Sequence, residues 1–478
     1  MSAKDGGTGM ELQNKATALW SNFLNVKMVQ IRTFHMTWFA FFACFFAWFG
    51  IAPLMSVVRD ELGLTPNQIG WAIIGSVSMT IFARLFIGWL CDRIGPRKSY
   101  TWLLIVGSLP VMGIGLAQSF ETFLLFRVLI GGIGASFVIT QYHTSVMFAP
   151  NVVGQANATS AGWGNLGGGV TQFVMPLLFS VMVVGFGFSE AVGWRLSMVV
   201  VGIIIFLIGI AYYFLTQDAP DGNFDDLRAQ GKMEEKKKVT GNYMNALKDP
   251  RVWVLFVIYG ACFGIELTVN NVAALYFMDY FDLSLVAAGF VAASFGLMNL
   301  FARTLGGIFG DNFGSLWGLK GRAFWLFICL FFEGCALMVF SQMHVLFLAL
   351  PALIVFSLFT QMAEGATYSV VPFINKKALG AVAGVVGAGG NAGAVLAGFL
   401  FKNVIDWSQA FFILGIVVTC ASFLAFAVRF SSKQEDEERA NFAAANIETL
   451  KAKAARANAA LDEGLEAIAS KGGTKPAQ

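Results

Sequence analysis

Two stretches of the sequence, FARLFIGWLCD at residues 82–92 and FARTLGGIFGD at residues 301–311, place Phe-Ala-Arg, Gly and Asp at identical spacing. Each stretch lies in a run of apolar residues that is long enough to cross a bilayer. A charged side chain at the centre of a spanning helix costs roughly 2.5 to 3.5 kcal/mol on insertion scales, so it usually faces a partner or a watery cavity. Arg84 and Arg303 are therefore candidate functional residues.

The composition is typical of a protein that crosses a membrane many times. Of the 478 residues, 57% are hydrophobic and 13% are charged, whereas roughly a quarter of the residues in a soluble domain carry a charge. Apolar runs of about 20 residues between polar breaks predict an all-α membrane protein with about twelve spans. The spans are expected near residues 34–58, 68–91, 100–118, 121–145, 155–185, 195–216, 252–277, 285–310, 322–341, 344–371, 379–402 and 407–430.

The basic residues predict the orientation of these spans. Most of the 32 Lys and Arg residues fall in the terminal segments and in alternate loops, while the opposite side holds only Arg59, Arg195 and Lys402. Because Lys and Arg concentrate in cytoplasmic loops, both termini are predicted to be cytoplasmic. The net charge of +3 follows from the same loops and does not indicate nucleic-acid binding.

A long polar loop divides the chain into two related halves of six spans. The predicted units are a cytoplasmic N-terminal segment (1–33), an N-terminal half (34–216), a cytoplasmic linker (217–250), a C-terminal half (251–430) and a cytoplasmic tail (431–478). A second repeated segment supports the relation, because GNLG at 164–167 is matched by GNAG at 390–393. Many secondary transporters have two such halves, with the substrate near the midplane between them.

Several motifs carry a resemblance to a known family. GWLCDRIGPRK (88–98) resembles the cytoplasmic loop motif of the major facilitator superfamily, and RVLIGGIGAS (127–136) resembles its fourth-helix motif. AGWGNLGGGVTQ (161–172) and GAGGNAGA (387–394) resemble the signature segments of nitrate/nitrite porters. The wider match, over about residues 34–430, is similar to high-affinity nitrate transporters of plants and their bacterial relatives; it includes QYHTSVMF (141–148) and GIELTVNN (264–271).

The resemblance implies a multi-pass transporter of the bacterial inner membrane or plasma membrane that acts as a monomer on nitrate, with nitrite as a further candidate substrate. Arginine suits an oxyanion because its planar fork donates two parallel hydrogen bonds and stays ionised. One guanidinium from each half would hold nitrate without a metal or other cofactor. The alternative is that Arg84 and Arg303 extend along their helices toward the cytoplasm.

The glycine-rich segments add further candidates for the binding site. Gly164 and Gly390 would let a helix or the substrate approach the backbone closely, and tight helix packing is the alternative. An amide in apolar surroundings needs a hydrogen-bond partner, so Asn165 and Asn391 either touch the anion or bridge helices.

Aromatic residues are the remaining candidates for the binding site. The resemblance implies that aromatic side chains sandwich the anion and that a tyrosine of the seventh span donates to it; Phe137 and Tyr259 match those positions. Phe46 of the first span is a further wall candidate. Because the chain has 48 phenylalanines, most of them must face lipid or other helices.

Coupling and gating residues form the last group of candidates. A buried carboxylate can be protonated reversibly, so Glu266 is the leading proton carrier, and Glu364 and His143 are further candidates. The gating candidates are Asp92, Arg93, Arg127 and Asp311. A hydrogen-bonded structural role is the alternative for Glu266 and His143.

The sequence therefore predicts a proton-coupled nitrate symporter, with nitrate/nitrite antiport as the alternative. No nucleophile-base pair, phosphate-binding loop or metal-ligand spacing indicates an enzyme. A nitrate sensor derived from a transporter is less favoured, because the tail from Ser431 to Gln478 is rich in Ala and charged residues and is expected to form a helix and a loose end, not a folded signalling domain. The six cysteines form no paired motif that indicates a disulfide or metal site.

Overall fold

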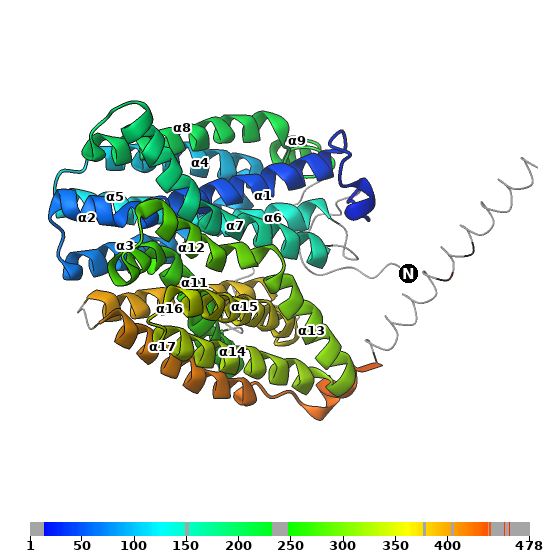
Figure 1. Cartoon of the computed structure of the whole chain (residues 1–478). Coiled ribbons are helices and arrows are strands. Elements are labelled where there is room, and N and C mark those ends of the chain that lie inside the picture. The colour runs from blue at the N-terminus through cyan, green and yellow to red at the C-terminus, as the bar shows by residue number, and fades with distance from the viewer. Residues whose placement is uncertain are drawn as a thin grey trace, which may run out of the picture.

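Helices that cross the molecule from end to end dominate the computed structural model (Figure 1). The structure describes residues 14–148, 153–231, 247–375, 379–402, 406–437, 439, 440, 454 and 458. Within these residues, twelve helical segments are long and apolar enough to span a membrane, which confirms the predicted fold class. Residues 1–13 of the predicted N-terminal segment, 232–246 of the predicted linker and most of the predicted tail lie outside the described residues.

Six spans precede the polar loop and six follow it. The first six are α1 (Val29–Trp48) with α2 (Met55–Leu62), α3 (Pro66–Ile94), α4 (Pro96–Gly113), α5 (Phe120–Gly131) with α6 (Ser136–Met147), α7 (Val153–Ser180) and α8 (Glu190–Leu215). The short helix α9 (Phe224–Ala229) lies in the loop. The second six are α11 (Pro250–Phe281), α12 (Leu285–Leu297) with α13 (Ala302–Trp317), α14 (Leu319–Ser341), α15 (Leu346–Val370), α16 (Leu379–Lys402) and α17 (Trp407–Ser422). The predicted spans agree with these helices, with ends displaced by a few residues.

Local sequence explains where several helices begin and break. Thr65 caps α3 in a capping box with Gln68, and Pro66 occupies the first helical position, where its missing N–H costs nothing. The fourth span changes to a 3-10 turn at Gly132–Ala135, and the eighth does so at Met298–Leu300. The second break lies about one turn before Arg303, so it helps to set the direction of that side chain.

The helices gather into two bundles that meet along the middle of the molecule. In Figure 1 the blue-to-green helices α1 to α8 lie in the upper part and the yellow-to-orange helices α14 to α17 in the lower part. The bundles touch where α7 packs on α12 and where α3 packs on α16. Each pair joins one helix from before the loop to one from after it.

Glycines allow the closest approach between the bundles. A Cβ atom built on Gly169 of α7 would lie 2.6 Å from the backbone carbonyl carbon of Gly296 on α12. On the other side of the interface, a Cβ on Gly70 of α3 would lie 2.2 Å from the Cα of Lys402 on α16. Backbones this close have no space for side chains between them, as in other membrane helix pairs with small residues.

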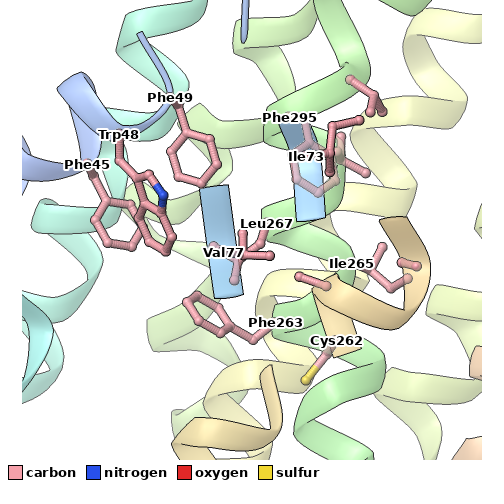
Figure 2. Packing of buried hydrophobic residues seen from close by; sticks show 14 of the residues in the cluster. Phe45, Trp48, Phe49, Ile73, Val77, Cys262, Phe263, Ile265, Leu267 and Phe295 are labelled. Atoms are coloured by element: carbon pink, nitrogen blue, oxygen red, sulfur yellow. The ribbon is translucent and has the colours of Figure 1, made fainter. Parts of the chain in front are cut away.

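Large apolar side chains fill the centre of the interface around these contacts. Figure 2 shows Phe45 and Trp48 of α1, and Phe49 directly after it, on one side of Val77 of α3, with Leu267 of α11 close to Val77. All five side chains are buried. Nearer the end of α2, Arg59 forms an ion pair of 2.7 Å with Asp279 of α11. The orientation predicted from the basic residues places that end outside the cell, so this ion pair joins the two halves on the predicted extracellular side.

Candidate functional site

The two repeated arginines meet in one pocket between the bundles. In this conformation its side chains close on one another, so no cavity large enough for a water molecule remains between them. The lining residues come from six helices and are Arg84 (α3), Phe137 (α6), Asn165 (α7), Tyr259 and Phe263 (α11), Arg303 (α13) and Gly387 (α16). Neither arginine extends to a helix end, so both positive charges face the same small space.

Arg84 is held by a backbone carbonyl and by aromatic rings. Its Nη1 donates to the Gly387 carbonyl oxygen at 3.1 Å, across the interface between the bundles. The guanidinium carbon lies 5.5 Å from the Phe137 ring centroid and 6.0 Å from that of Phe263, which is within cation–π range. Its Nε is buried without a hydrogen-bond partner among the described residues. Arg84 therefore keeps hydrogen-bonding capacity for a ligand.

Arg303 has partners of a different kind, all from its own half. Its Nη2 donates to the Tyr259 hydroxyl at 2.9 Å, and its Nη1 lies 2.6 Å from the Glu364 Oε2 atom. The atoms of that ion pair are not aligned as a hydrogen bond. The guanidinium carbon lies 5.9 Å from the Phe263 ring centroid. Glu364 thus compensates one of the two positive charges in the pocket.

Phe263 forms an apolar wall between the two arginines. Its ring stacks on that of Tyr259, with centroids 5.2 Å apart and an interplanar angle of 17°. Both residues lie on α11 and are separated by four positions, so they share one face of the helix. Arg84 and Arg303 therefore both lie near the same aromatic ring, at 6.0 and 5.9 Å from its centroid.

The two repeated asparagines occupy different surroundings. Asn165 lines the pocket, whereas Asn391 is not among the lining residues. Both side chains are buried, and for both of them neither amide atom has a hydrogen-bond partner in the described part of the chain. A buried polar group without a partner is rare in folded proteins. At Asn165 the unused donor and acceptor face the space where a ligand would lie.

Gly164, Gly390 and Phe46 lie in helix packing outside the pocket. A Cβ on Gly164 would come within 1.7 Å of Phe41 of α1, and one on Gly390 would come within 2.3 Å of Phe263. Phe46 packs against the ring of Phe42, which is also on α1. Each glycine thus lets two helices of the same half touch, as the tight-packing alternative expects.

The three proton-carrier candidates separate in space. Glu364 contacts Arg303, and the Glu266 carboxyl faces Glu364 and accepts a hydrogen bond of 2.7 Å from the Asn299 amide. His143 lies elsewhere: its Nε2 is 2.8 Å from the Gln217 carbonyl oxygen and its Nδ1 is 2.6 Å from the Tyr212 hydroxyl. Because a carbonyl only accepts, the His143 Nε2 donates, and the ring joins α6 to the end of α8.

Comparison with known proteins identifies the family. The model of the Major Facilitator Superfamily matches residues 37–375. The chain belongs to the major facilitator superfamily. It is 40% identical to a high affinity nitrate transporter (2.5) of Arabidopsis thaliana, over 82% of this chain and 77% of the relative. It is 30% identical to a nitrate/nitrite transporter, NrtP, of Nostoc punctiforme, over 83% of this chain and 92% of the relative.

Solved structures support the same fold. A bacterial homologue of the human lysosomal transporter Spinster, crystallised in an inward-facing and unoccupied conformation, has a TM-score of 0.66 at 16% identity. The match covers 86% of this chain and 99% of that chain. The protein is thus a multi-pass integral membrane transporter of the major facilitator superfamily and not an enzyme.

Arg127, in the fourth-helix superfamily motif, is a bridge between the two halves. Its Nη2 donates to the Asn271 side-chain oxygen on α11 at 2.8 Å, and its Nη1 donates to the Trp48 carbonyl at 3.2 Å. The side chain is fully buried. Gln172 of α7 makes a parallel bridge, because its amide donates to the Asn270 carbonyl at 2.7 Å. Both side chains therefore hold the two halves together in this conformation.

The remaining gating candidates lie in the second half of α3 and of α13, toward the side predicted to be cytoplasmic. Asp311 accepts a bond of 2.6 Å from Arg322 of its own half. Arg93 lies 5.2 Å from the ring centroid of Trp89, which is also a neighbour in its own half. The side chain of Asp92 lies outside the described residues. The contacts with Arg322 and Trp89 therefore hold the helix ends within each half and do not join the two halves.

The superfamily loop motif is anchored to the end of α8 by Asp218. Its carboxylate accepts hydrogen bonds from the backbone N–H groups of Arg97, at 2.8 Å, and Phe224, at 3.1 Å. Burial raises the pKa of Asp218, although these bonds act in the opposite direction. Gly95 has a φ of +88° and its absent Cβ leaves room for the carboxylate. This side chain therefore holds the turn between α3 and α4 in place.

The sequence indicates two further lining residues to different degrees. Phe263 follows Tyr259 by one helical turn, so its position on the same face of α11 was a usable signal. Gly387 contributes a carbonyl oxygen to Arg84, and no side-chain pattern identifies a backbone ligand of this kind. Across the described residues, no group of three His, Cys, Asp or Glu side chains is placed to hold a metal ion.

Proposed function

We propose that the protein carries nitrate across the bacterial inner membrane or plasma membrane by alternating access, as a monomer and in symport with protons. The observation that carries the proposal is the convergence of Arg84 and Arg303, from equivalent positions in the two halves, on one aromatic pocket. The names of the relatives in Arabidopsis thaliana and Nostoc punctiforme support nitrate as the substrate, with nitrite as a second one.

The chemistry of the pocket suits a small planar anion. Nitrate has three oxygens in one plane, so a guanidinium on each side can donate to it while the faces of the ion lie against Phe137 and Phe263. Bonds from ionised donors are roughly twice as strong as neutral ones. The Asn165 amide and the Tyr259 hydroxyl add donors that a spherical ion such as chloride would use less well.

Alternating access follows from the position of the pocket between two bundles. In the present conformation the extracellular side is closed by the Arg59–Asp279 pair, the Arg127 bridge and the glycine contact of α7 with α12. Opening that side requires these contacts to separate while α3 and α16, which carry Arg84 and Gly387, move apart. The anion gains access from one side at a time.

Nitrate/nitrite exchange remains the second candidate, because two arginines suffice to bind either anion without a proton carrier. A transport-derived sensor would bind nitrate without moving it. These three functions predict different results when the protein works alone in a sealed vesicle.

The test is uptake of labelled nitrate into proteoliposomes that contain the purified full chain. Symport predicts uptake driven by an inward proton gradient into vesicles with no internal anion substrate. Exchange predicts uptake only when nitrite or nitrate is present inside, and a sensor predicts binding without uptake. Failure of nitrate to bind or to enter under any of these conditions would overturn the proposal.

A further inference from the structure

Fully buried acids inside the described membrane spans occur in only one half of the molecule. Three glutamates, Glu266, Glu333 and Glu364, lie in the middle of spans of the C-terminal half and are fully buried. In the N-terminal half, the acids in the spans lie near helix ends; they are Asp60, Glu61, Asp92, Glu121 and Glu190. The arginines are therefore repeated between the halves, but the buried acids are not.

Two of these acids form a line of polar groups that starts at the pocket. Arg303 on α13 contacts Glu364 on α15, Glu364 faces Glu266 on α11, and Glu266 accepts a bond from Asn299 at the break before α13. Oε1 of Glu364 and Oε2 of Glu266 have no hydrogen-bond partner within the part of the chain described. The line thus carries one positive group and two carboxyls.

The contact of Glu364 with Arg303 competes with anion binding. The Arg303 Nη2 donates to the Tyr259 hydroxyl, and its Nη1 lies 2.6 Å from the Glu364 carboxyl. Nitrate at the Nη1 side of this guanidinium would lie beside the Glu364 carboxylate, so the two negative groups compete for Arg303. A neutral carboxyl holds a guanidinium more weakly than a carboxylate does, because the charge-assisted part of the interaction is lost.

We propose that Glu364 is the residue that couples the proton to nitrate and that Glu266 supports it as a facing carboxyl. This inference rests on the proposed nitrate transport. A proton binds Glu364 and frees Arg303, nitrate then binds Arg303 and Arg84, and the loaded carrier reorients. When nitrate leaves, Glu364 releases the proton to the same side and pairs with Arg303 again.

The groups around Glu364 are consistent with this exchange of partners. It interacts with Arg303 on α13, Glu333 on α14, and Glu266, Tyr259 and Cys262 on α11, together with Tyr368 on its own helix. Arg303 is the cation among these residues. An ionised Glu364 without it would be an isolated charge in a low-dielectric interior, which is costly. Nitrate capture of Arg303 and protonation of Glu364 therefore favour each other.

Nitrate binding to the purified full chain, measured by isothermal titration calorimetry, tests the proposal. In the pH range where Glu364 is mainly ionised, affinity should fall by about tenfold per pH unit if one proton binds with the anion. The heat should vary with the ionisation enthalpy of the buffer and report uptake of about one proton. Because this measurement uses the unaltered protein, its result does not depend on whether a variant folds.

Three substitutions assign the effect to a residue. E364Q should bind nitrate with little pH dependence, lose uptake driven by a proton gradient and keep nitrate/nitrate counterflow, because counterflow never needs the empty carrier to reorient. E364D keeps a titratable group and should retain pH-dependent binding. E333Q removes an equally buried acid of the neighbouring helix that forms no ion pair with Arg303, and it should keep both pH-dependent binding and uptake driven by a proton gradient.

Each contrary outcome has a separate meaning. Binding that remains pH-dependent in E364Q but not in E266Q would move the role to Glu266 and overturn the assignment. Nitrate transport by the unaltered protein with no proton uptake on binding would also overturn it, yet leave nitrate transport intact. Only the absence of nitrate binding and transport in the unaltered protein would remove the proposed function itself.

Discussion

Replacement of Arg84 by lysine isolates the contribution of the guanidinium fork. Lysine keeps the positive charge but presents a point charge in place of two parallel donors. In the structure the Arg84 Nη1 bonds the Gly387 carbonyl while its Nε has no partner among the described groups, so the fork has capacity for an anion. Loss of one hydrogen bond to a charged partner costs about 1.5 to 3 kcal/mol. Nitrate affinity should therefore fall by about 10-fold to 150-fold.

The assay for this change is nitrate binding to purified protein, with uptake into proteoliposomes as a second readout. Arg32→Lys is the matched control, because Arg32 donates to the Leu215 carbonyl at 2.7 Å and does not line the pocket. It should change affinity by no more than about twofold, the effect of an ordinary surface substitution. An Arg84→Lys protein that folds normally and binds nitrate as tightly as this control would refute the fork as an anion ligand.

The remaining predictions concern the closed extracellular side and the pocket wall. Gly169→Ala should favour the state with an open extracellular side, because its Cβ would lie 2.6 Å from the backbone of α12. Gly132→Ala is the control, since a Cβ on Gly132 meets nothing within 4 Å. Reaction of external thiol reagents with a reporter cysteine should rise in Gly169→Ala and not in Gly132→Ala. Charge reversal of either Arg59 or Asp279 should also raise that labelling, because it breaks their 2.7 Å ion pair. Reversal of both charges should return the labelling to the level of the unaltered protein, and equal labelling in all these variants would show that the pair plays no part in closure. Tyr259→Phe removes the hydroxyl that accepts a hydrogen bond of 2.9 Å from Arg303. Loss of one hydrogen bond, about 1 kcal/mol, should weaken nitrate binding roughly fivefold. Unchanged affinity would exclude this hydroxyl from the site.

Most of the fold could be predicted from hydropathy and charge. A bilayer requires each span to be apolar over about 20 residues, so polar breaks such as the loop before α11 are visible in one sequence. Arg84 and Arg303 could be selected for the same reason, since a charge in the middle of an apolar span is costly. Repetition of their spacing then placed both at one depth.

The partners of these residues could not be predicted in the same way. Equivalent positions in two repeats lie at the same depth in the membrane, but their side chains need not point toward the pocket. Asn165 therefore lines the pocket, whereas Asn391 does not. The contact between Arg303 and Glu364 joins α13 and α15, and no spacing along the chain indicates which helices are neighbours. Gly164 illustrates the same limit, because its close packing partner lies on α1.

The two facing carboxyls beside Arg303 also decide how the membrane voltage acts on the carrier. If Glu364 alone exchanges a proton, one proton accompanies each nitrate and the complete cycle moves no net charge. Nitrate alone would carry one negative charge inward in each cycle. An interior-negative potential of 100 mV would oppose that movement by about 2.3 kcal/mol per elementary charge. The proton on Glu364 therefore removes the electrical cost of moving the anion into the cell.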